Sequence, residues 1–463
     1  MEGRPSLTER LSTFLVATKS TALPPSVVDD AKYYTLDWLG SAMAGTETKP
    51  GRMLLAYAAS QAGQGATVIG LGEERNADLA ALTNGGLSHI VEMDDLDRAS
   101  VVHPAAPIIP AALATAEREG KSGLDFLTAV VLGYEVAIRI GEAVGRSHYR
   151  FWHNTATCGV FGVAAAAGWL LGLDAEQMVW ALGNAGTMAA GLWEFIADGA
   201  MSKHLHAGRA ASSGLLAADL AQRGFTGARR ILGGERGFFA ATSSDARPDL
   251  VVAGLRHGMA DYRIGGVSIK PYPSCRHTHP AIDAALALCQ QHVLVPDQIA
   301  KVEVETYQAA LDLIDNPNPT HPYAAKFSLQ YCVACALARG RVGLDDFRSE
   351  VLEDEAMRRL MARMSIGLSE ELDDHYPQEW PARVQVVLDD GRKLAQLVKV
   401  PKGDPENPLT QAELEEKFRL LTTGTGYEEM ADVLVEGVNR LERLEKVRQL
   451  LTPLRQTFSG EEL

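Results

Sequence analysis

The stretch ARVQVVLDDGRKLAQLVKV, residues 382–400, contains two runs in which apolar and polar residues alternate. The dipeptide Asp390-Gly391 lies between them, and Asp-Gly is typical of the two-residue turn of a β-hairpin. Residues 301–307, KVEVETY, alternate in the same way, as a strand with one buried face does. These runs predict a β-sheet in this part of the chain.

Helical patterns surround the predicted strands. Residues 281–292 and 323–338 have helical patterns and lie in the same region as the strands. Before about residue 260 no sustained alternation occurs, and the stretch VFGVAAAAGWLLG, residues 160–172, has the small and apolar side chains of a buried helix. A Pro/Gly-rich break, PKGDPENP at 401–408, precedes a return to helical patterns.

These patterns together predict the fold class and the domains. A chain of 463 residues exceeds the usual size of one hydrophobic core, so two domains are expected. We predict a mainly α protein with a large all-helical domain, residues 1–265 and 402–463, and a smaller α+β lid domain, residues 266–401.

Three local patterns predict helix starts and a helix face. Ser6-Leu-Thr-Glu9 and Asp174-Ala-Glu-Gln177 have the spacing of capping boxes. In residues 437–451 apolar side chains recur every three residues, which we interpret as one face of a single helix. These side chains are Val438, Leu441, Leu444 and Val447.

The composition limits the partners. Lys and Arg total 44 against 59 Asp and Glu, a net charge of −15, which argues against nucleic acid or an anionic membrane. A small anionic substrate in a locally basic pocket remains compatible with this charge.

Cysteine usage and the absence of targeting patterns indicate a compartment. The five cysteines are an odd, scattered set, which predicts reduced thiols, and Cys332 and Cys335 form a C-x-x-C in what we interpret as a buried helix. The N-terminus lacks the pattern of a signal peptide, and the longest apolar run, 160–173, is too short to span a bilayer. We therefore expect a soluble, cytoplasmic protein.

The first cluster of titratable residues is HIVEMDDLDRASVVHPAAPIIP, residues 89–110. Adjacent Asp94 and Asp95 cannot both face inward on a regular helix, so at most one is expected to point at a substrate. His103 follows and leads directly into an apolar run, which favours a position near the core. The alternative is an acidic helix end followed by a loop.

The second cluster is MSKHLHAGRAASSG, residues 201–214. It contains Lys203, His204, His206 and Arg209, and no acid occurs from 199 to 218. Two histidines two residues apart point to different sides of a helix, so the spacing argues against a zinc site. A cationic pocket wall and a solvated helix start both remain possible.

The third cluster is KPYPSCRHTHPAID, residues 270–283, which concentrates basic and titratable side chains. Lys270, Arg276, His277 and His279 could bind carboxylates, and Tyr272 or a histidine could exchange protons. A basic surface loop is the alternative. A fourth and weaker candidate is His153, which precedes a Gly-containing helix start that could favour an anion.

Motifs of other enzyme classes are missing. The glycines of GQGATVIGLG, residues 63–72, do not have the G-x-G-x-x-G spacing of a dinucleotide site. The sequence contains no P-loop, G-x-S-x-G or H-E-x-x-H motif. A cofactor-free site built from His, Lys, Arg and Tyr remains.

Five ordered blocks of this sequence resemble the MmgE/PrpD family over nearly the whole chain. The blocks are VEMDDLDRASVVHP, WHNTATCGVFGVAAAA, MSKHLHAGRAA with GFTGARRILGGERGF, SIKPYPSCRHTHPAIDA and AAKFSLQYCVA. The family includes 2-methylcitrate dehydratases, cis-aconitate decarboxylases and an iminodisuccinate epimerase. The resemblance implies an all-helical domain with both chain ends, an inserted α+β domain, a homodimer, and a site in the cleft between the domains without metal or organic cofactor.

The resemblance also implies the site residues. The catalytic candidates are Asp94, His103, His153, Lys203, Tyr272 and His279. The substrate-binding candidates are Arg98, His206, Lys270, Arg276, His277 and Tyr331. The sequence differs from the family pattern in DDLDRAS, where Asp97 and Arg98 stand close after the Asp pair and family members commonly carry Thr, Ser or Asn.

The residue types suit chemistry at a carbon beside a carboxylate. Lys203, Lys270 and Arg276 would hold the substrate carboxylates and stabilise developing charge. His103, oriented by Asp94, could remove the proton, because an unperturbed histidine with a pKa of about 6.5 suits a general base. Tyr272 or His279 could protonate a leaving hydroxyl.

The first functional hypothesis is a cofactor-independent dehydratase acting on a 2-methylcitrate-like hydroxy polycarboxylate. An epimerase of the iminodisuccinate type or a cis-aconitate decarboxylase could use the same residues, because fold resemblance does not select the reaction. From another class, the chain could be a non-catalytic binder of polycarboxylates.

Overall fold

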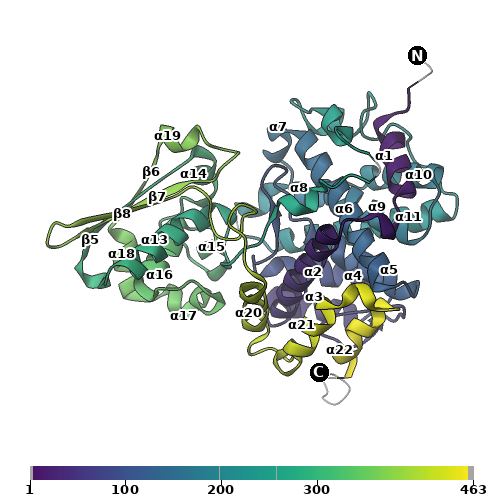
Figure 1. Cartoon of the computed structure of the whole chain (residues 1–463). Coiled ribbons are helices and arrows are strands. Elements are labelled where there is room, and N and C mark those ends of the chain that lie inside the picture. The colour runs from purple at the N-terminus through teal and green to yellow at the C-terminus, as the bar shows by residue number, and fades with distance from the viewer. Residues whose placement is uncertain (1–3, 198, 257, 457–463) are drawn as a thin grey trace. The chain divides into compact units, whose positions relative to one another are not determined.

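The structure is a computed structural model that describes residues 4–197, 199–256 and 258–456. It is 59% helical with few strands, so the prediction of a mainly α fold with a smaller α+β part is confirmed. The chain divides into two compact units (Figure 1). Unit 1 contains the residues up to Ile90, Asp94–Val267 and the residues from Thr410 onward; unit 2 contains Val91–Met93 and Ser268–Leu409.

Unit 1 is a helical assembly. Before residue 260 its longer helices are α1 (Leu7–Ala17), α2 (Pro25–Thr46), α3 (Lys49–Ala59), α4 (Ala77–Ile90), α5 (Ala105–Arg118), α6 (Gly123–Val144), α9 (Gly159–Leu170), α10 (Ala175–Thr187) and α11 (Ser202–Gln222). Three short helices are α7 (Arg146–Tyr149), α8 (Asn154–Thr157) and α12 (Phe238–Thr242). The two-stranded ribbon of β1 (Ala66–Thr67) and β2 (Glu74–Arg75) precedes α4.

Close packing of small residues explains the core of unit 1. Helix α9 is buried along almost its whole length, as its composition predicts. It packs on α6 at Gly162 and Gly133, where a Cβ added to Gly162 would lie 2.5 Å from the carbonyl oxygen of Gly133. Only glycine allows this approach of the two helices. The capping boxes at Ser6 and Asp174 are both present, as predicted.

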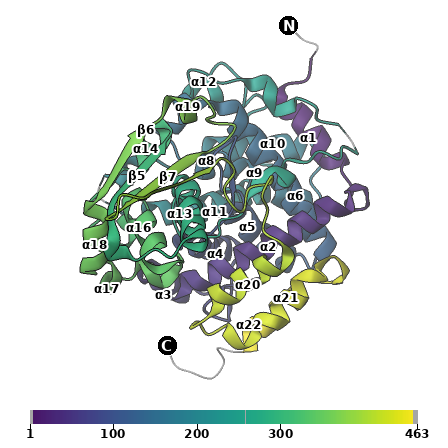
Figure 2. The ribbon, with the colours of Figure 1, turned by 60° about the vertical axis from the view of Figure 1, so that its left-hand side comes forward.

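The C-terminal helices belong to unit 1. They are α20 (Gln411–Thr422), α21 (Ala431–Asn439) and α22 (Thr452–Gln456), and α20 and α21 pack on α2 (Figure 2). Lys417 on α20 donates to the buried Asp37 of α2.

The predicted single helix over 437–451 is wrong. Helix α21 ends at Asn439, and two 3₁₀ helices follow, η9 (Leu441–Arg443) and η10 (Val447–Leu451). A spacing of three residues matches the 3₁₀ repeat of three residues per turn rather than the 3.6 of an α-helix. Between the two, Leu444 has an extended backbone (φ −71°, ψ 124°).

Unit 2 is built on a four-stranded sheet in the order β6-β5-β7-β8. Its strands are β5 (Ile299–Thr306), β6 (Met364–Leu368), β7 (Ala382–Leu388) and β8 (Lys393–Val398). Strand β5 runs parallel to β6 and antiparallel to β7, and β7 and β8 form the predicted hairpin. Gly391 in its turn has φ +85°, a conformation that favours glycine.

Helices accompany this sheet. They are α13 (His279–Gln291), α14 (Gln308–Ile314), α15 (Pro322–Ala325), α16 (Leu329–Arg339), α17 (Ser349–Leu352), α18 (Glu355–Ala362) and α19 (Glu370–Asp373). Helix α13 packs on β7, β8 and α16. The helix predicted over 323–338 is interrupted, because Ser328 caps a new helix by accepting from the backbone N–H of Tyr331.

The C-x-x-C cysteines lie in this second helix. Cys332 and Cys335 on α16 are buried and not disulfide-bonded. Burial raises the pKa of Cys332 to about 12, so its thiol is protonated at neutral pH. The expectation that these cysteines pack in the core is confirmed. Among the residues described, no helix combines the length and apolar character needed to cross a membrane.

Candidate active site

The segment that carries Asp94 and His103 lies between two helices of unit 1. Helix α4 ends at Ile90, and β3 (Leu96–Asp97) and the turn after it lead to α5, which begins at Ala105. The backbone N–H of His103 donates to Thr155 on α8, and Asn154 of the same helix donates to the carbonyl of Ser100. These two bonds hold the turn against α8, next to His153.

Asp94 and Asp95 are both buried, and they have different partners. They lie outside any helix, so the restriction expected from helical geometry does not apply. Asp95 accepts from the hydroxyl of Tyr134 at 2.7 Å and from the backbone N–H of Ala105 at 3.0 Å. Asp95 therefore anchors the segment to α5 and α6, and Asp94 is the carboxylate that faces histidines.

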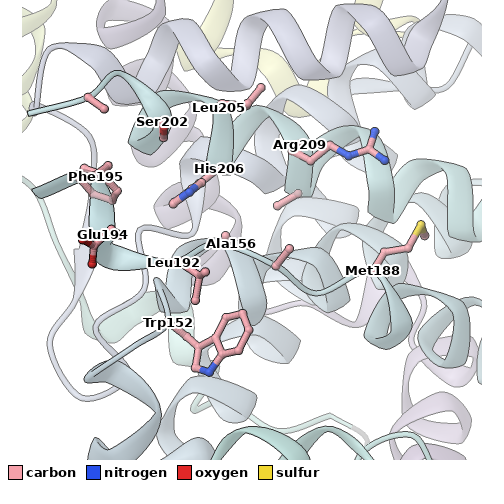
Figure 3. Close-up of a pocket in the computed structure, with 14 residues that line it drawn as sticks. Trp152, Ala156, Met188, Leu192, Glu194, Phe195, Ser202, Leu205, His206 and Arg209 are labelled. Carbon is pink, nitrogen blue, oxygen red and sulfur yellow. The ribbon is translucent and has the colours of Figure 1, made fainter. Parts of the chain in front are cut away.

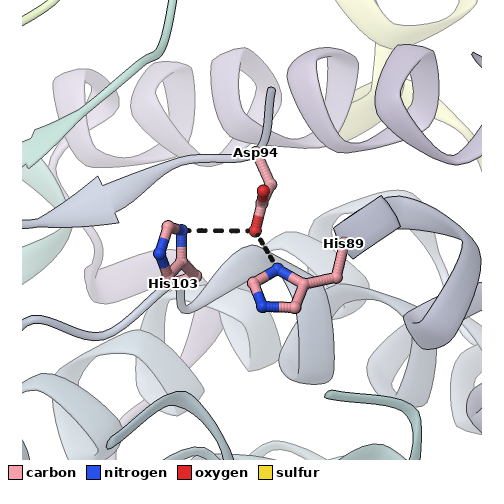
Figure 4. Close-up of side chains that lie close together, drawn as sticks. All are labelled: His89, Asp94 and His103. Carbon is pink, nitrogen blue, oxygen red and sulfur yellow. Dashed lines mark hydrogen bonds and ion pairs between the residues drawn. The ribbon is translucent and has the colours of Figure 1, made fainter. Parts of the chain in front are cut away.

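Two imidazoles share one oxygen of Asp94 (Figure 4). Oδ2 of Asp94 lies 2.6 Å from Nδ1 of His89 and 3.3 Å from Nδ1 of His103. Nδ1 of His103 also lies 2.6 Å from the carbonyl oxygen of Asp95. Because a carbonyl oxygen only accepts, Nδ1 of His103 carries the proton and Nε2 is the nitrogen that exchanges protons.

Asp94 is ionised in this arrangement. Burial alone raises the pKa of this carboxyl, but the charges and hydrogen bonds of His89 and His103 outweigh burial and hold its pKa well below the usual range. A carboxylate that orients one nitrogen of a histidine and stabilises the protonated ring is a common element of proton-transfer sites. His103 is the most exposed of the three, with 12% of its side chain accessible.

Two further histidines extend the group. The ring of His153 stacks on His89 with centroids 5.5 Å apart, and its Nδ1 lies 3.3 Å from Nδ1 of His206. Burial, together with His89 and Lys203, lowers the pKa of His153 well below its ordinary value and that of His206 to about 4. Both rings are therefore neutral at neutral pH. We call His89, Asp94, His103, His153 and His206 the imidazole cluster.

Lys203 is a cation that acts on this cluster, and Arg98 is a second candidate cation of unit 1. Lys203, in the first turn of α11, is buried and acts electrostatically on His153 and His206. Arg98 is half-buried in the turn after β3. Its neighbour Asp97 accepts from the backbone and hydroxyl of Ser100, and burial raises the pKa of Asp97 to about 6.

A groove of about 570 Å³ has His206 in its lining (Figure 3). Its wall is largely apolar, with Trp152, Leu192, Phe195 and Leu205, and it also contains Glu194 and Arg209. The second sequence cluster therefore divides. Lys203 lies with the imidazole cluster, Arg209 lies on the exposed groove, and His206 contacts His153 and also lines the groove.

Three groups of the cluster could in principle hold a metal ion. Ligand atoms of His89, Asp94 and His103 lie within 4.8 Å of one another. However, two ligands on a tetrahedral zinc stand about 3.3 Å apart, given bond lengths near 2.0–2.1 Å. The 2.6 Å between Nδ1 of His89 and Oδ2 of Asp94 is instead the length of a charge-assisted hydrogen bond.

The basic residues of 270–283 lie in unit 2, and buried acids pair with them. Lys270 lies 3.2 Å from Glu92, which also accepts from the hydroxyl of Tyr323. Glu92 has φ +60°, a backbone conformation that residues other than glycine adopt rarely. Arg276 forms a buried ion pair with Asp404.

Tyr272 and His279 are also engaged. The hydroxyl of Tyr272 donates to Asp283 at 2.6 Å, and burial with the charge of Asp283 raises the pKa of Tyr272. Nδ1 of His279 accepts from Arg276 at 2.8 Å, which leaves Nε2 to donate to the carbonyl of Ser274 at 3.3 Å. Both nitrogens of His279 thus have partners.

His277 and Tyr331 are core residues of unit 2. The ring of His277 stacks on Trp380 at 4.3 Å and its Nδ1 lies 2.6 Å from the hydroxyl of Tyr307. Burial lowers the pKa of His277 to about 3. Tyr331 is buried on α16 and donates to the carbonyl of Asp346.

Sequence reasoning gave no role to His89 or to the acids that pair with the basic stretch. His89 begins the first cluster of titratable residues, and its position five residues before Asp94 was a usable signal. For Glu92 and Asp404 no comparable signal exists, because both are far from 270–283 in sequence, whereas Asp283 is the last residue of that stretch.

Two family domain models match the sequence. The sequence model of the MmgE/PrpD N-terminal domain matches residues 9–251, and that of the MmgE/PrpD C-terminal domain matches residues 272–443. The second match runs past unit 2 into α20 and α21 of unit 1.

Three curated relatives are named as cis-aconitate decarboxylases or as 2-methylcitrate dehydratases. A cis-aconitate decarboxylase-like protein of Aspergillus oryzae is 27% identical over 98% of both chains. A cis-aconitate decarboxylase of Aspergillus terreus is 29% identical over 93% of this chain and 92% of its own. A mitochondrial 2-methylcitrate dehydratase of Yarrowia lipolytica is 26% identical over 56% of this chain and 52% of its own.

The two domain matches cover most of the sequence, and the resemblance stated from its five blocks is confirmed. The chain belongs to the MmgE/PrpD family.

Proposed function

We propose that this chain is a lyase acting on a small di- or tricarboxylate, and that decarboxylation of a cis-aconitate-like triacid is its reaction. The observation that carries this proposal is the contact between Asp94 and His103. In this contact an ionised carboxylate lies beside the Nδ1–H of a partly exposed histidine. The decarboxylase relatives match over nearly their whole length, which supports the same choice.

The reaction needs one proton from the protein. The C–C bond to one substrate carboxylate breaks, carbon dioxide leaves, and the electron pair delocalises over the neighbouring double bond and carboxylate. A proton then adds to carbon. Asp94 stabilises the imidazolium form of His103, so Nε2–H of His103 is the proton donor and solvent restores the proton afterwards.

Lys203 and His153 bind and orient the substrate. Lys203 is a buried cation that would pair with a substrate carboxylate and stabilise the charge that develops as carbon dioxide leaves. His153 is neutral, so it offers a hydrogen bond without competing as a proton donor.

Dehydration of a 2-methylcitrate-like hydroxy acid is the second candidate, favoured by the dehydratase relative. It requires both a base and an acid for the leaving hydroxyl, with Tyr272 or His279 as the acid. The contacts of these residues support decarboxylation instead. Tyr272 already donates to Asp283, and both nitrogens of His279 have partners.

Product analysis in D₂O separates the reactions. Purified protein would be mixed in turn with citrate, 2-methylcitrate, cis-aconitate and iminodisuccinate, and followed by NMR. The proposal expects loss of carbon dioxide from cis-aconitate with one deuteron on a product carbon. Alkene formation from 2-methylcitrate would instead establish the dehydratase, and deuterium entry without net conversion an epimerase. Binding without any turnover would establish a non-catalytic binder and contradict the proposal.

We also propose that the reaction needs no metal. The hydrogen-bond length between His89 and Asp94 supports this. Turnover after dialysis against EDTA is expected to equal that of untreated protein. Loss of turnover that added Zn²⁺ or Mg²⁺ restores would overturn this part of the mechanism.

The chain is further proposed to act as a homodimer through the groove beside His206. Leu192 and Leu205 line this groove and are 54% and 50% exposed, and Glu194 and Arg209 supply opposite charges on the same surface. A surface with an apolar centre and both charge signs can pair with its own copy about a two-fold axis. Sedimentation should give a dimer for the natural chain and a monomer for Leu205→Glu; a monomeric natural chain would contradict this proposal.

A further inference from the structure

His89 has no role in the mechanism above, yet it makes the shortest contact to Asp94. It lies in the last turn of α4, fully buried, with Nδ1 2.6 Å from Oδ2 of Asp94. Because Asp94 is ionised and accepts, Nδ1 of His89 carries a proton and donates it. His89 is thus the main hydrogen-bond donor to the carboxylate that orients His103.

The surroundings of Asp94 make this donor necessary. Asp94 is fully buried, and Oδ1 has no hydrogen-bond partner within the described part of the chain. His103 divides its Nδ1–H between Asp94 and the carbonyl of Asp95, and the Asp95 contact is the shorter by 0.7 Å (3.3 Å against 2.6 Å). A buried carboxylate with only this weak partner would take up a proton.

His89 itself is held by stacking rather than by a second hydrogen bond. Its Nε2 is buried and has no partner among the described residues. The ring stacks on His153 with an interplanar angle of 18° and meets the edge of His103 at 5.1 Å. A side chain with a single hydrogen bond, to Asp94, fits a positioning role better than the role of a linker within the helical core.

We propose that His89 is a positioning residue that keeps Asp94 ionised and thereby keeps His103 in the tautomer that transfers the proton at Nε2. This inference rests on the proposed function of the Asp94 and His103 pair. The other charged and titratable groups facing the pair are Asp95, His153, Lys203 and His206.

Two substitutions of similar polarity test this role. In His89→Asn the amide nitrogen stands near the position of Nδ1 and can still donate to Asp94. In His89→Gln the amide lies one bond further out, near the position of Nε2, where it does not reach Asp94. The two variants therefore differ in reach rather than in chemistry, and each serves as the control for the other.

The expected results follow from the loss of one hydrogen bond to a buried charge. His89→Gln should lower kcat by about 10- to 100-fold with KM within about threefold, and His89→Asn should recover kcat to within about threefold of the natural chain. In His89→Gln the pKa of Asp94 rises, so activity should be lost as pH falls, with the acid limb of kcat about one unit higher. Equal kcat and equal pH profiles for the two variants would overturn the proposal.

A second measurement needs no substrate. With ¹³C-labelled aspartate, the Asp94 carboxyl should titrate at the same low pH in the natural chain and in His89→Asn. It should titrate at a higher pH in His89→Gln, and an unchanged titration there would overturn the role of His89. If the signals behave as expected but no polycarboxylate is turned over, the proposed function fails and the role of His89 stands.

Discussion

The imidazole cluster of unit 1 and the basic stretch 270–283 of unit 2 contain similar residue types in opposite electrostatic situations. In the cluster, two imidazoles share one ionised carboxylate, and His89 and Asp94 each keep a buried atom without a partner in the described chain. In the stretch, Lys270, Arg276 and Tyr272 are each paired with an acid, although Nε of Arg276 is also buried without a hydrogen-bond partner among the described residues. A dense run of basic residues therefore does not by itself mark a catalytic site; several titratable groups around one charge are the stronger indication.

The largest expected effect is on turnover, from a change in the cluster. His103→Gln removes the proton donor and should lower kcat by about 10²- to 10⁴-fold, the usual contribution of general acid–base catalysis. Steady-state kinetics on the natural substrate would measure it. His148→Gln, a buried histidine of unit 1 outside the cluster, is the matched control and should retain turnover. Equal losses of turnover in both variants would show that the substitutions act by impairing folding.

The second effect is on stability, from a change in the basic stretch. Arg276→Met leaves Asp404 buried without its ion-pair partner and should cost about 3–5 kcal/mol of unfolding free energy. Urea denaturation would measure this cost. The double variant Arg276→Met with Asp404→Leu should recover much of it, because no buried charge is left alone. A stable Arg276→Met chain with no turnover would mean that Arg276 binds substrate.

Tyr272→Phe should have a smaller effect on stability, and its effect on turnover distinguishes decarboxylation from dehydration. The change removes the hydroxyl that donates to Asp283 and should cost about 1–3 kcal/mol of stability, because a buried acceptor loses its donor. Turnover by decarboxylation should stay within a few-fold of the natural chain. A loss of more than about 100-fold in a folded variant would identify Tyr272 as a catalytic acid and favour dehydration.

The smallest effect concerns pH and a histidine outside both regions. Burial lowers the pKa of His148 to about 4 from an ordinary value of 6.5, so the folded state binds less proton than the unfolded state between these values. Unfolding is therefore favoured as pH falls from 6.5 to 4. In thermal denaturation, the natural chain should lose more stability over this window than His148→Gln does. Parallel curves would show that His148 does not contribute.

Periodicity made much of the fold predictable. The β7–β8 hairpin and the buried helix α9 follow from alternation and from small residues, which are local properties. The C-terminal region was not predictable in the same way, since a three-residue repeat over 437–451 can continue an α-helix or, as here, form separate 3₁₀ helices. Which one forms depends on packing against the rest of unit 1.

The candidate site was only partly accessible from the sequence. Asp94, His103 and His153 stood out because titratable residues lie next to apolar runs. The role of His89 depends on where α4 ends and on the chain turning back to bring Asp94 to its ring. The pairing of 270–283 depends on acids that are distant in sequence, with Glu92 178 residues from Lys270 and Asp404 128 residues from Arg276. Only the tertiary structure brings these groups together.

The central claim is that ionised Asp94 stabilises the protonated ring of His103. Histidine NMR with ¹⁵N-labelled imidazoles tests it directly, with the His103 signal assigned by its loss in His103→Gln. In Asp94→Asn the pH midpoint of the His103 signal should fall by about one unit or more, because a neighbouring opposite charge is lost. The natural chain should show Nδ1–H on the neutral ring. An unchanged midpoint, or a neutral ring with its proton on Nε2, would contradict the account.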